Sequence, residues 1–168
     1  MDGGRRRDRQ SALTLVAEQR PDEGRALAFC GHCGRRPQRG FRAHARVCES
    51  CGLGLILRCS AQDAPPVDGA FLVLDARLRV CAVSRRAEQL LAVSETDVVD
   101  RHLSALLVPA EAQAASGESL AVAIVQAAGG DRVTRTAVVR PANTFGVRIN
   151  ARIASCGPRP AALIVLEL

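Results

Sequence analysis

The chain has 168 residues, 48% of them hydrophobic, and a formal net charge of +6. This length allows one domain or two small ones, and a module of about 40 residues would need a metal or disulfides to fold alone. There is no N-terminal apolar run of the signal-peptide type, no stretch of the ~18 apolar residues needed to span a membrane, and the cysteine count is odd. We therefore expect a soluble cytoplasmic protein with reduced thiols and no membrane contact.

The positive charge is concentrated in the first third of the chain. Every basic residue is an arginine, and residues 1–60 hold 12 arginines against 6 Asp and Glu, whereas residues 61–168 hold 11 against 11. A basic part beside a neutral part suggests two roles. The arginines either contact an acidic partner such as nucleic acid or form a solvated face, and composition leaves both alternatives open.

Residues 1–25 begin with a charged, glycine-containing lead that has little apolar surface to fold around. Ser11 could cap a short helix in which Leu13, Val16 and Ala17 share a face, ending before Pro21. We expect a basic lead followed by this possible helix.

Two close pairs of cysteines dominate residues 26–60. They are Cys30, Cys33, Cys48 and Cys51. Four thiolates in two C-x2-C pairs match the tetrahedral ligand set of a structural zinc ion, and the 14 residues between the pairs suit a small zinc ribbon. Gly34 and Gly52 follow the pairs directly, and a residue free to take positive φ lets the backbone curl around the sulfurs. We predict one zinc ion on these four sulfurs.

The loop between the pairs is the most basic part of this module and is its candidate polyanion contact. The loop's arginines are Arg35, Arg36, Arg39, Arg42 and Arg46. They accompany one aromatic ring, Phe41, which could stack on a base. His32 or His44 could replace a cysteine ligand, an arrangement that four ordered cysteines disfavour.

After the second pair, the run Leu53–Leu57 is predicted to form a short strand or helix start that serves as the core of the metal module. Cys59 falls outside the paired spacing, so we expect a buried or surface thiol there and not a fifth ligand. Pro65 and Pro66 lack amide donors and favour extended backbone, which places a linker at residues 61–67. A second domain would span residues 68–168.

This second domain opens with a predicted hairpin, 70–75 and 78–83, followed by short helices. Ser84 can cap the first helix, Ser94 with Asp97 opens the next, and a third holds Leu103, Leu106 and Leu107 before Pro109. A longer helix is predicted at 116–128, where Gly129 and Gly130 end it.

Three strands close the chain, at 133–140, 145–154 and 161–167. Val147, Ile149, Ala151 and Ile153 alternate with Arg148, Asn150 and Arg152, so one sheet face should be packed and the other wet. The prediction is an α+β fold with a five-stranded antiparallel sheet, short flanking helices and a small N-terminal zinc ribbon.

The stretch GAFLVLDARLRVCAVSRRAEQLLAVSETDVVDRHLSALL, residues 69–107, resembles the opening of a PAS domain, with a hairpin, an Ala-x-x-Leu-Leu helix and a Leu-x-x-Leu-Leu turn. The likeness extends over residues 68–168, while residues 26–60 resemble a zinc ribbon. Together they resemble a bacterial sensory or regulatory protein acting in signal transduction or transcription. The PAS resemblance implies a sensing or protein-interaction module.

The sequence carries no recognisable cofactor or catalytic motif. The Asn-Cys-Arg-Phe-Leu motif of flavin-binding members is absent, and residues 116–128 lack the histidine that haem-binding members need. Cys81 and Cys156 could be redox-active, as could Cys59 in a redox sensor, although such thiols are more often small core residues. We expect a non-enzymatic protein. Its output would be either nucleic-acid or protein contact through the zinc module, or pairing with a PAS partner, including a homodimer.

Replacing Cys33 or Cys48 by Ser should abolish zinc binding and unfold residues 26–60, because formation of the metal site supplies the folding energy of so small a module. Metal analysis of the purified variants checks this, and full zinc occupancy in both would contradict it.

Overall fold

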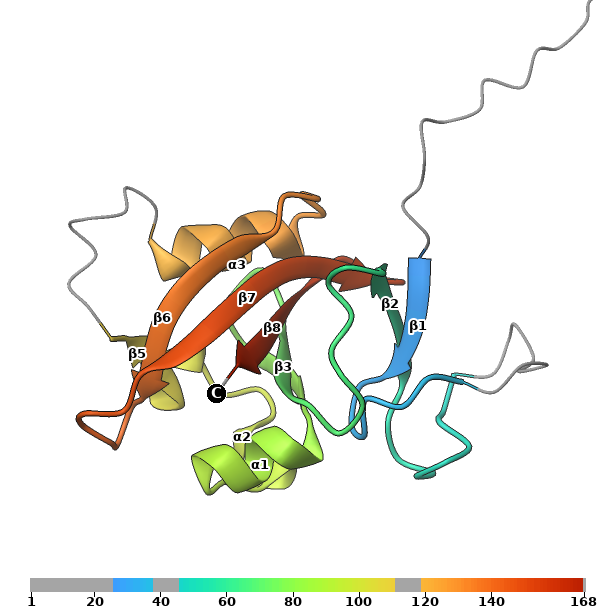
Figure 1. The fold of residues 1–168 in the computed structure, drawn as a ribbon, viewed down its shortest axis with the longest axis horizontal. Coiled ribbons are helices and arrows are strands. Elements are labelled where there is room, and N and C mark those ends of the chain that lie inside the picture. The colour runs from blue at the N-terminus through green and yellow to red at the C-terminus, as the bar shows by residue number, and fades with distance from the viewer. Residues whose placement is uncertain (1–25, 38–45, 111–118, 168) are drawn as a thin grey trace, which may run out of the picture.

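The computed structural model describes residues 26–37, 46–110 and 119–167 (Figure 1). The eight strands among them are β1 (Ala26–Cys30), β2 (Ile56–Ser60), β3 (Ala70–Leu74), β4 (Val80–Val83), β5 (Leu107–Pro109), β6 (Arg135–Pro141), β7 (Ile149–Gly157) and β8 (Ala161–Glu167). The helices are α1 (Arg85–Leu91), α2 (Glu95–Val98), the 3-10 turn η1 (Leu103–Ala105) and α3 (Leu120–Ala128). The helix predicted after Ser11 and the loop 38–45 lie outside the described residues. No described helix is long and apolar enough to cross a membrane.

All eight strands belong to one curled antiparallel sheet. Its main order is β1-β2-β7-β8-β3-β4, and β6 pairs with both β7 and β5. β6 occupies one end of the β7 edge, opposite residues 149–153, and β2 occupies the other end, opposite residues 156 and 157. The expected sequence of strand, strand, helices and three strands is therefore present, but the predicted count of five strands is wrong. Short β5 and the hairpin β1–β2 extend the sheet.

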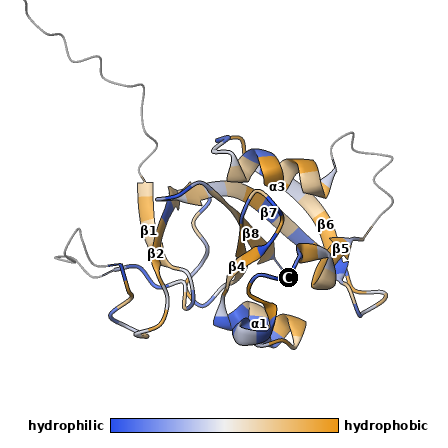
Figure 2. Ribbon diagram, turned by 180° about the vertical axis from the view of Figure 1, so that it is seen from behind, coloured by the Kyte–Doolittle hydropathy of each residue, from blue (hydrophilic) through white to orange (hydrophobic). Residues whose placement is uncertain are grey.

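The helices cover one face of the sheet and enclose the helix-side core (Figures 1 and 2). Alternate residues of β3 and β8, such as Leu72 and Ile164, point to this face because successive side chains of a strand alternate. Ile124 of α3 is fully buried in the same cluster. Figure 2 shows the hydrophobic colour along β8 and α3. The core is continuous over α1, α2, η1 and α3.

The opposite face carries a second cluster, the hairpin-side core, made of Phe29, Cys59, Phe71, Val73, Cys156, Leu163 and Val165. The rings of Phe29 on β1 and Phe71 on β3 meet edge to face at 5.7 Å between centroids. These strands are separated by β2, β7 and β8 in the sheet order, so the sheet curls until β1 lies against β3. The prediction of a wholly wet face is therefore wrong, since Ala154 and Cys156 are buried there.

Three local predictions also fail. Leu53 and Leu55 are 70% and 59% exposed, and β2 begins only at Ile56, so the apolar run is not the module's core. The Ser94 side chain bonds to Thr96 Oγ1 at 2.8 Å and makes no cap bond to α2. The third predicted helix is the η1 turn only, because the backbone from Leu107 onward pairs with β6 as β5.

Ser84 caps α1 as predicted. Its Oγ accepts from the backbone N–H of Ala87 at 3.1 Å and from that of Phe71 at 2.9 Å, and it donates to the carbonyl of Gly69 at 2.9 Å. This fully buried hydroxyl thus joins the start of α1 to β3. α3 starts at Leu120 with Ser119 as its cap and ends at Ala128, followed by Gly129 as the C-cap, where the glycine pair was expected to stop it.

The segment predicted as a linker is held against the sheet. Asp63 is 4% exposed, and its carboxylate accepts from Thr134 Oγ1 at 2.7 Å and lies 3.9 Å from the Arg152 guanidinium. Arg152 also donates to the carbonyl of Gln62. Whether a fragment starting near Gln62 folds alone stays a prediction, and such a fragment would leave Phe71 without Phe29.

Phe29→Ala should destabilise the protein by about 3–5 kcal/mol, because it removes a fully buried ring that joins the hairpin to β3. Denaturant unfolding monitored by circular dichroism measures this. Phe145→Ala is the matched control, since Phe145 is 83% exposed and its ring contacts only the Arg140 guanidinium among the contacts described, worth about 0.5–1 kcal/mol. Equal losses in both variants would contradict the role given to Phe29.

Candidate metal centre

The four predicted cysteine ligands come together at the end of the β1–β2 hairpin. Cys30 closes β1, Cys33 follows in the turn after it, and the second pair precedes β2. Their sulfurs all lie within 4.8 Å of one another. Cys30 Sγ is 3.6 Å from Cys51 Sγ, and Cys33 Sγ is 3.9 Å from Cys48 Sγ.

These separations fit a single ion. Tetrahedral coordination with metal–sulfur bonds of about 2.3 Å separates neighbouring sulfurs by about 3.8 Å. The short sulfur–sulfur distances run between the pairs, so one ion would tie the turn after β1 to the turn before β2. The four cysteines could therefore hold a metal ion, and Cys30 and Cys48 are almost fully buried around it.

The same backbone turn occurs twice around the sulfurs, once at each cysteine pair. The N–H of Gly34 donates to the carbonyl of Cys30 at 3.0 Å, and the N–H of Gly52 donates to the carbonyl of Cys48 at 2.8 Å. Both glycines have φ of 70°, as predicted from their position after each pair. In the first turn, the amides of His32 and Cys33 point at Cys30 Sγ, each at 3.4 Å. Such amides stabilise a thiolate ligand.

Gly54 has a role that the sequence pattern did not reveal. A Cβ atom at this position would lie 2.3 Å from Cys30 Sγ and 2.8 Å from the backbone N of His32. Only glycine therefore lets the segment just before β2 pass so close to Cys30 and His32. The carbonyl of Gly54 also accepts from the N–H of Cys48 at 2.8 Å, which closes the second turn.

The pKa values of Cys30, Cys33 and Cys51 are shifted in different directions. Burial raises the pKa of Cys30 to about 12 and also raises that of Cys33. Burial acts in the same direction on Cys51, but hydrogen bonds from the backbone of Gly54 and Leu53 bring its pKa down to about 6. At neutral pH Cys51 offers a ready thiolate, whereas an ion must displace protons from Cys30 and Cys33.

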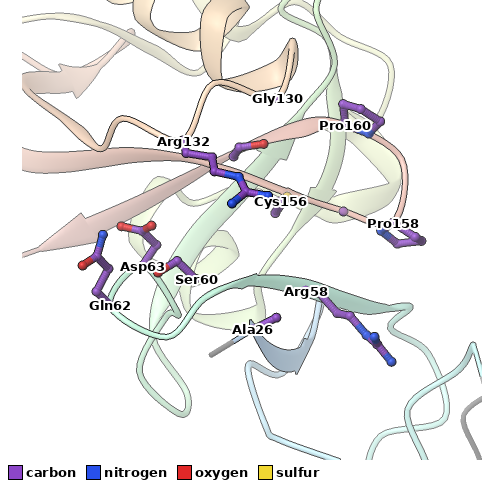
Figure 3. A pocket seen from close by; sticks show the side chains of 12 residues that line it. Ala26, Arg58, Ser60, Gln62, Asp63, Gly130, Arg132, Cys156, Pro158 and Pro160 are labelled. Carbon is purple, nitrogen blue, oxygen red and sulfur yellow. The ribbon is translucent and has the colours of Figure 1, made fainter. Parts of the chain in front are cut away.

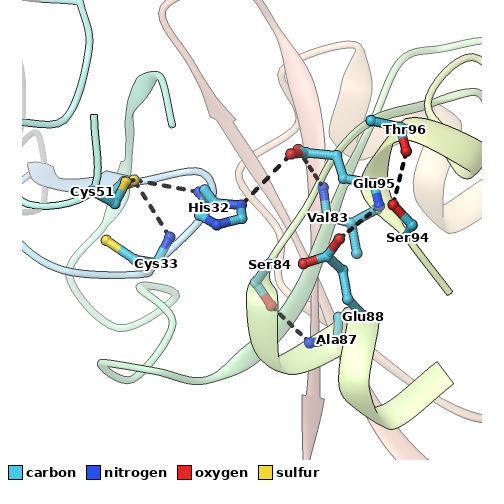
Figure 4. Close-up of polar contacts among 11 residues, drawn as sticks. His32, Cys33, Cys51, Val83, Ser84, Ala87, Glu88, Ser94, Glu95 and Thr96 are labelled. Carbon is cyan, nitrogen blue, oxygen red and sulfur yellow. Dashed lines mark hydrogen bonds and ion pairs between the residues drawn. The ribbon is translucent and has the colours of Figure 1, made fainter. Parts of the chain in front are cut away.

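His32 connects the centre to the helices (Figure 4). Its carbonyl accepts from the N–H of Arg85, the first residue of α1, at 2.9 Å, a donor that a helix leaves unpaired at its start. Its buried Nδ1 lies 3.6 Å from a carboxylate oxygen of Glu95 on α2. Glu95 in turn accepts from the N–H of Val83 at 3.4 Å and donates its own N–H to Glu88 at 2.7 Å. No spacing rule relates His32 to Glu95, so sequence reasoning missed this contact.

The candidate polyanion surface is only partly described. Arg35, Arg36 and Arg46 are exposed, and Arg39 and Arg42 lie outside the described residues together with Phe41 and His44. Arg35 helps to line a cavity of about 470 Å³ beside the metal centre, where Arg85 also lies.

The three remaining cysteines differ in exposure. Cys59 and Cys156 are buried in the hairpin-side core, while Cys81 on β4 is exposed.

No protein-family model matches the chain, and no curated protein matches it. Several solved structures are similar to part of the chain. One is the PAS domain of nitrogen regulation protein NR(II) from Vibrio parahaemolyticus, at 17% identity and a TM-score of 0.42 over 58% of this chain and 86% of that one. Another is a domain of the sensory box sensor histidine kinase/response regulator from Geobacter sulfurreducens, at 14% identity and a TM-score of 0.42 over 60% of this chain and 82% of that one. A further one is the PAS domain of HTR-like protein from Haloarcula marismortui, at 17% identity and a TM-score of 0.40 over 62% of this chain and 88% of that one.

Zinc added to the metal-free chain at pH 7 should release two or more protons per ion, because the raised pKa values keep Cys30 and Cys33 protonated until the metal binds. Affinity should fall as the pH is lowered, since protons then compete for all four sulfurs. Titration in two buffers of different ionisation enthalpy counts the protons. Zinc binding without proton release would contradict the prediction that Cys30 and Cys33 are protonated in the metal-free chain.

Proposed function

We propose that the chain is a non-enzymatic sensory or regulatory protein in which a PAS-like domain is coupled to a zinc-holding hairpin and acts by contacting a protein, in the first place a second copy of itself. The PAS-like assignment rests on the resemblance of residues 69–107 and on the element order, two strands, helices and three strands. The zinc assignment rests on four sulfurs at tetrahedral spacing.

Zinc is the metal that best suits this ligand set. Four thiolates favour a soft or borderline ion, and tetrahedral sulfur coordination is the usual geometry of structural zinc. A centre filled by four protein ligands keeps no position for water or substrate, which supports a structural role in place of catalysis. The ion would set the shape of the hairpin turn, and with it the placement of His32.

The contact of His32 with both α1 and α2 carries the proposal. Through its carbonyl and its ring, one residue between two metal ligands touches the first N–H of α1 and the Glu95 carboxylate. A change at the metal centre therefore alters the environment of the helices directly. Since linkage is reciprocal, an event at the helices would alter metal binding by the same factor.

The test measures self-association of the full chain with zinc, after chelation, and in the variant Glu95→Gln. We expect a dimer in the zinc form. Self-association should weaken by about fivefold or more when zinc is removed or Glu95 is replaced by Gln. Sedimentation equilibrium gives the constants, and native mass spectrometry counts zinc and subunits. Asp97→Asn is the matched control, because Asp97 is an exposed carboxylate on the same helix.

A chain that stays monomeric with and without zinc would contradict the proposed self-contact. Association that is equal in zinc-bound, chelated and Glu95→Gln protein would contradict the coupling. A shift in Asp97→Asn equal to that in Glu95→Gln would show a general charge effect and would also count against it.

A further inference from the structure

Among the described residues, the hairpin that carries the metal centre is joined to the rest of the sheet by only two residue pairs. Arg58 lies opposite Gly157, and Cys59 lies opposite Cys156. Two of the three cysteines that take no part in the metal centre thus face each other at this join. Both are buried, at 6% and 4% exposure, and both belong to the hairpin-side core.

The hydrogen-bond pattern of the hairpin fixes the class of this cysteine pair. The N–H of Gly31 donates to the carbonyl of Leu55 at 2.8 Å, so every second residue of β2 onward from Leu55, including Cys59, directs its backbone groups toward β1. Arg58 therefore forms the hydrogen-bonded pair with Gly157 on the other side. Cys59 and Cys156 form a non-hydrogen-bonded pair, in which the Cα atoms lie about 4.5 Å apart and the side chains are closest.

This geometry is compatible with a covalent bond. Disulfides need Cα separations of about 4.4–6.8 Å and side chains on the same face. Directly opposed residues of antiparallel strands share a face, and both thiols pack in one core cluster. Closing the bond would need only rotation of the two side chains, with the strands kept in register.

A route for a small oxidant leads to one of the two thiols. Cys156 lines a cavity of about 650 Å³ between the hairpin, the end of β7 and the turn after α3 (Figure 3). Ser60, Asp63 and Arg132 also line it. In Figure 3 the Arg132 side chain reaches across this cavity toward Cys156. Peroxide is small enough to occupy such a cavity, and Cys59 is not among the residues that line it.

We propose that Cys59 and Cys156 are a redox-sensitive dithiol whose oxidation to a disulfide locks the metal-bearing hairpin onto the sheet. A peroxide is the oxidant. The Cys156 thiolate attacks one peroxide oxygen, which gives a sulfenic acid and releases water or an alcohol. The Cys59 thiolate then attacks the sulfenic sulfur, the S–S bond forms and water leaves. Two thiols lose two electrons and two protons, and the peroxide gains both.

The environment makes this pair slow to react and hence different from a surface thiol. Burial raises the pKa of both Cys59 and Cys156 to about 12, with Asp63 adding to the effect at Cys59 and Arg152 opposing it. Both thiols stay protonated at neutral pH, so their oxidation requires prolonged exposure to peroxide. Mildly alkaline solution speeds the reaction because it raises the thiolate fraction. The function proposed above does not depend on this pair.

The experiment treats the folded, zinc-loaded full chain with hydrogen peroxide at mildly alkaline pH, blocks free thiols, and maps the digest by mass spectrometry. We expect a peptide that joins Cys59 to Cys156, while zinc is retained. Amide exchange in β1 and β2 should slow by about tenfold or more, because the bond removes the freedom of the hairpin to detach. Cys156→Ala should lose the linked peptide and the slower exchange, and Cys81→Ala, which changes an exposed thiol outside the pair, should keep both.

Two results would overturn the proposal. One is that Cys59 and Cys156 are recovered as free thiols from protein in which Cys81 is fully oxidised. The other is that the linked peptide forms only in urea-unfolded chain, which would show that the folded geometry does not permit the bond. Since the first readout uses the wild-type chain alone, a variant that fails to fold does not affect it.

Discussion

The packing of Phe29 on Phe71 is the contact on which the arrangement of this protein depends. It draws the first strand of the hairpin across the curled sheet onto β3, although three strands separate the two in the sheet order. Backbone pairing alone would attach the hairpin to the sheet only weakly, since β2 pairs with β7 at two residue pairs. The aromatic contact and the thiols beside it bury the junction and so fix the direction in which the metal centre faces.

With that direction fixed, the first cysteine turn lies against the helices. A Cβ atom on Gly34 would lie 3.0 Å from the carbonyl of Pro66 and 3.4 Å from the ring of Phe71, so the turn packs directly on the hairpin-side core. His32 then reaches α1 and α2 from the other side of the same turn. The first cysteine turn thus meets the hairpin-side core through Gly34 and the helices through His32.

Much of this could be predicted from local sequence patterns. The two C-x2-C pairs gave the sulfur cluster, Ser84 gave the start of α1, and the strand 161–167 was placed as found. These depend on spacing, capping and alternation within a few residues. The α+β class with an antiparallel sheet was also predicted, from the order of the elements.

The remaining features depend on contacts between residues distant in sequence. Leu53 and Leu55 were assigned to a core on hydrophobicity, but the strand enters its pairing two residues later and leaves both exposed. Ala154 was not foreseen as buried, because it lies on the sheet face that was expected to be wet. Cys156 was expected to be a small core residue more often than a redox-active one, but its packing against a hairpin far earlier in the sequence was not foreseen. The approach of His32 to Glu95, and the closeness of Gly54 to Cys30, require the same long-range arrangement.

Hydrogen exchange of the full chain before and after zinc removal tests whether the metal centre shapes the hairpin and supports the start of α1. We predict that chelation exposes the amides of β1, β2 and Arg85, while those of β7, β8 and α3 keep their protection. Unchanged protection of residues 26–30, 56–60 and Arg85 after complete zinc removal would contradict it.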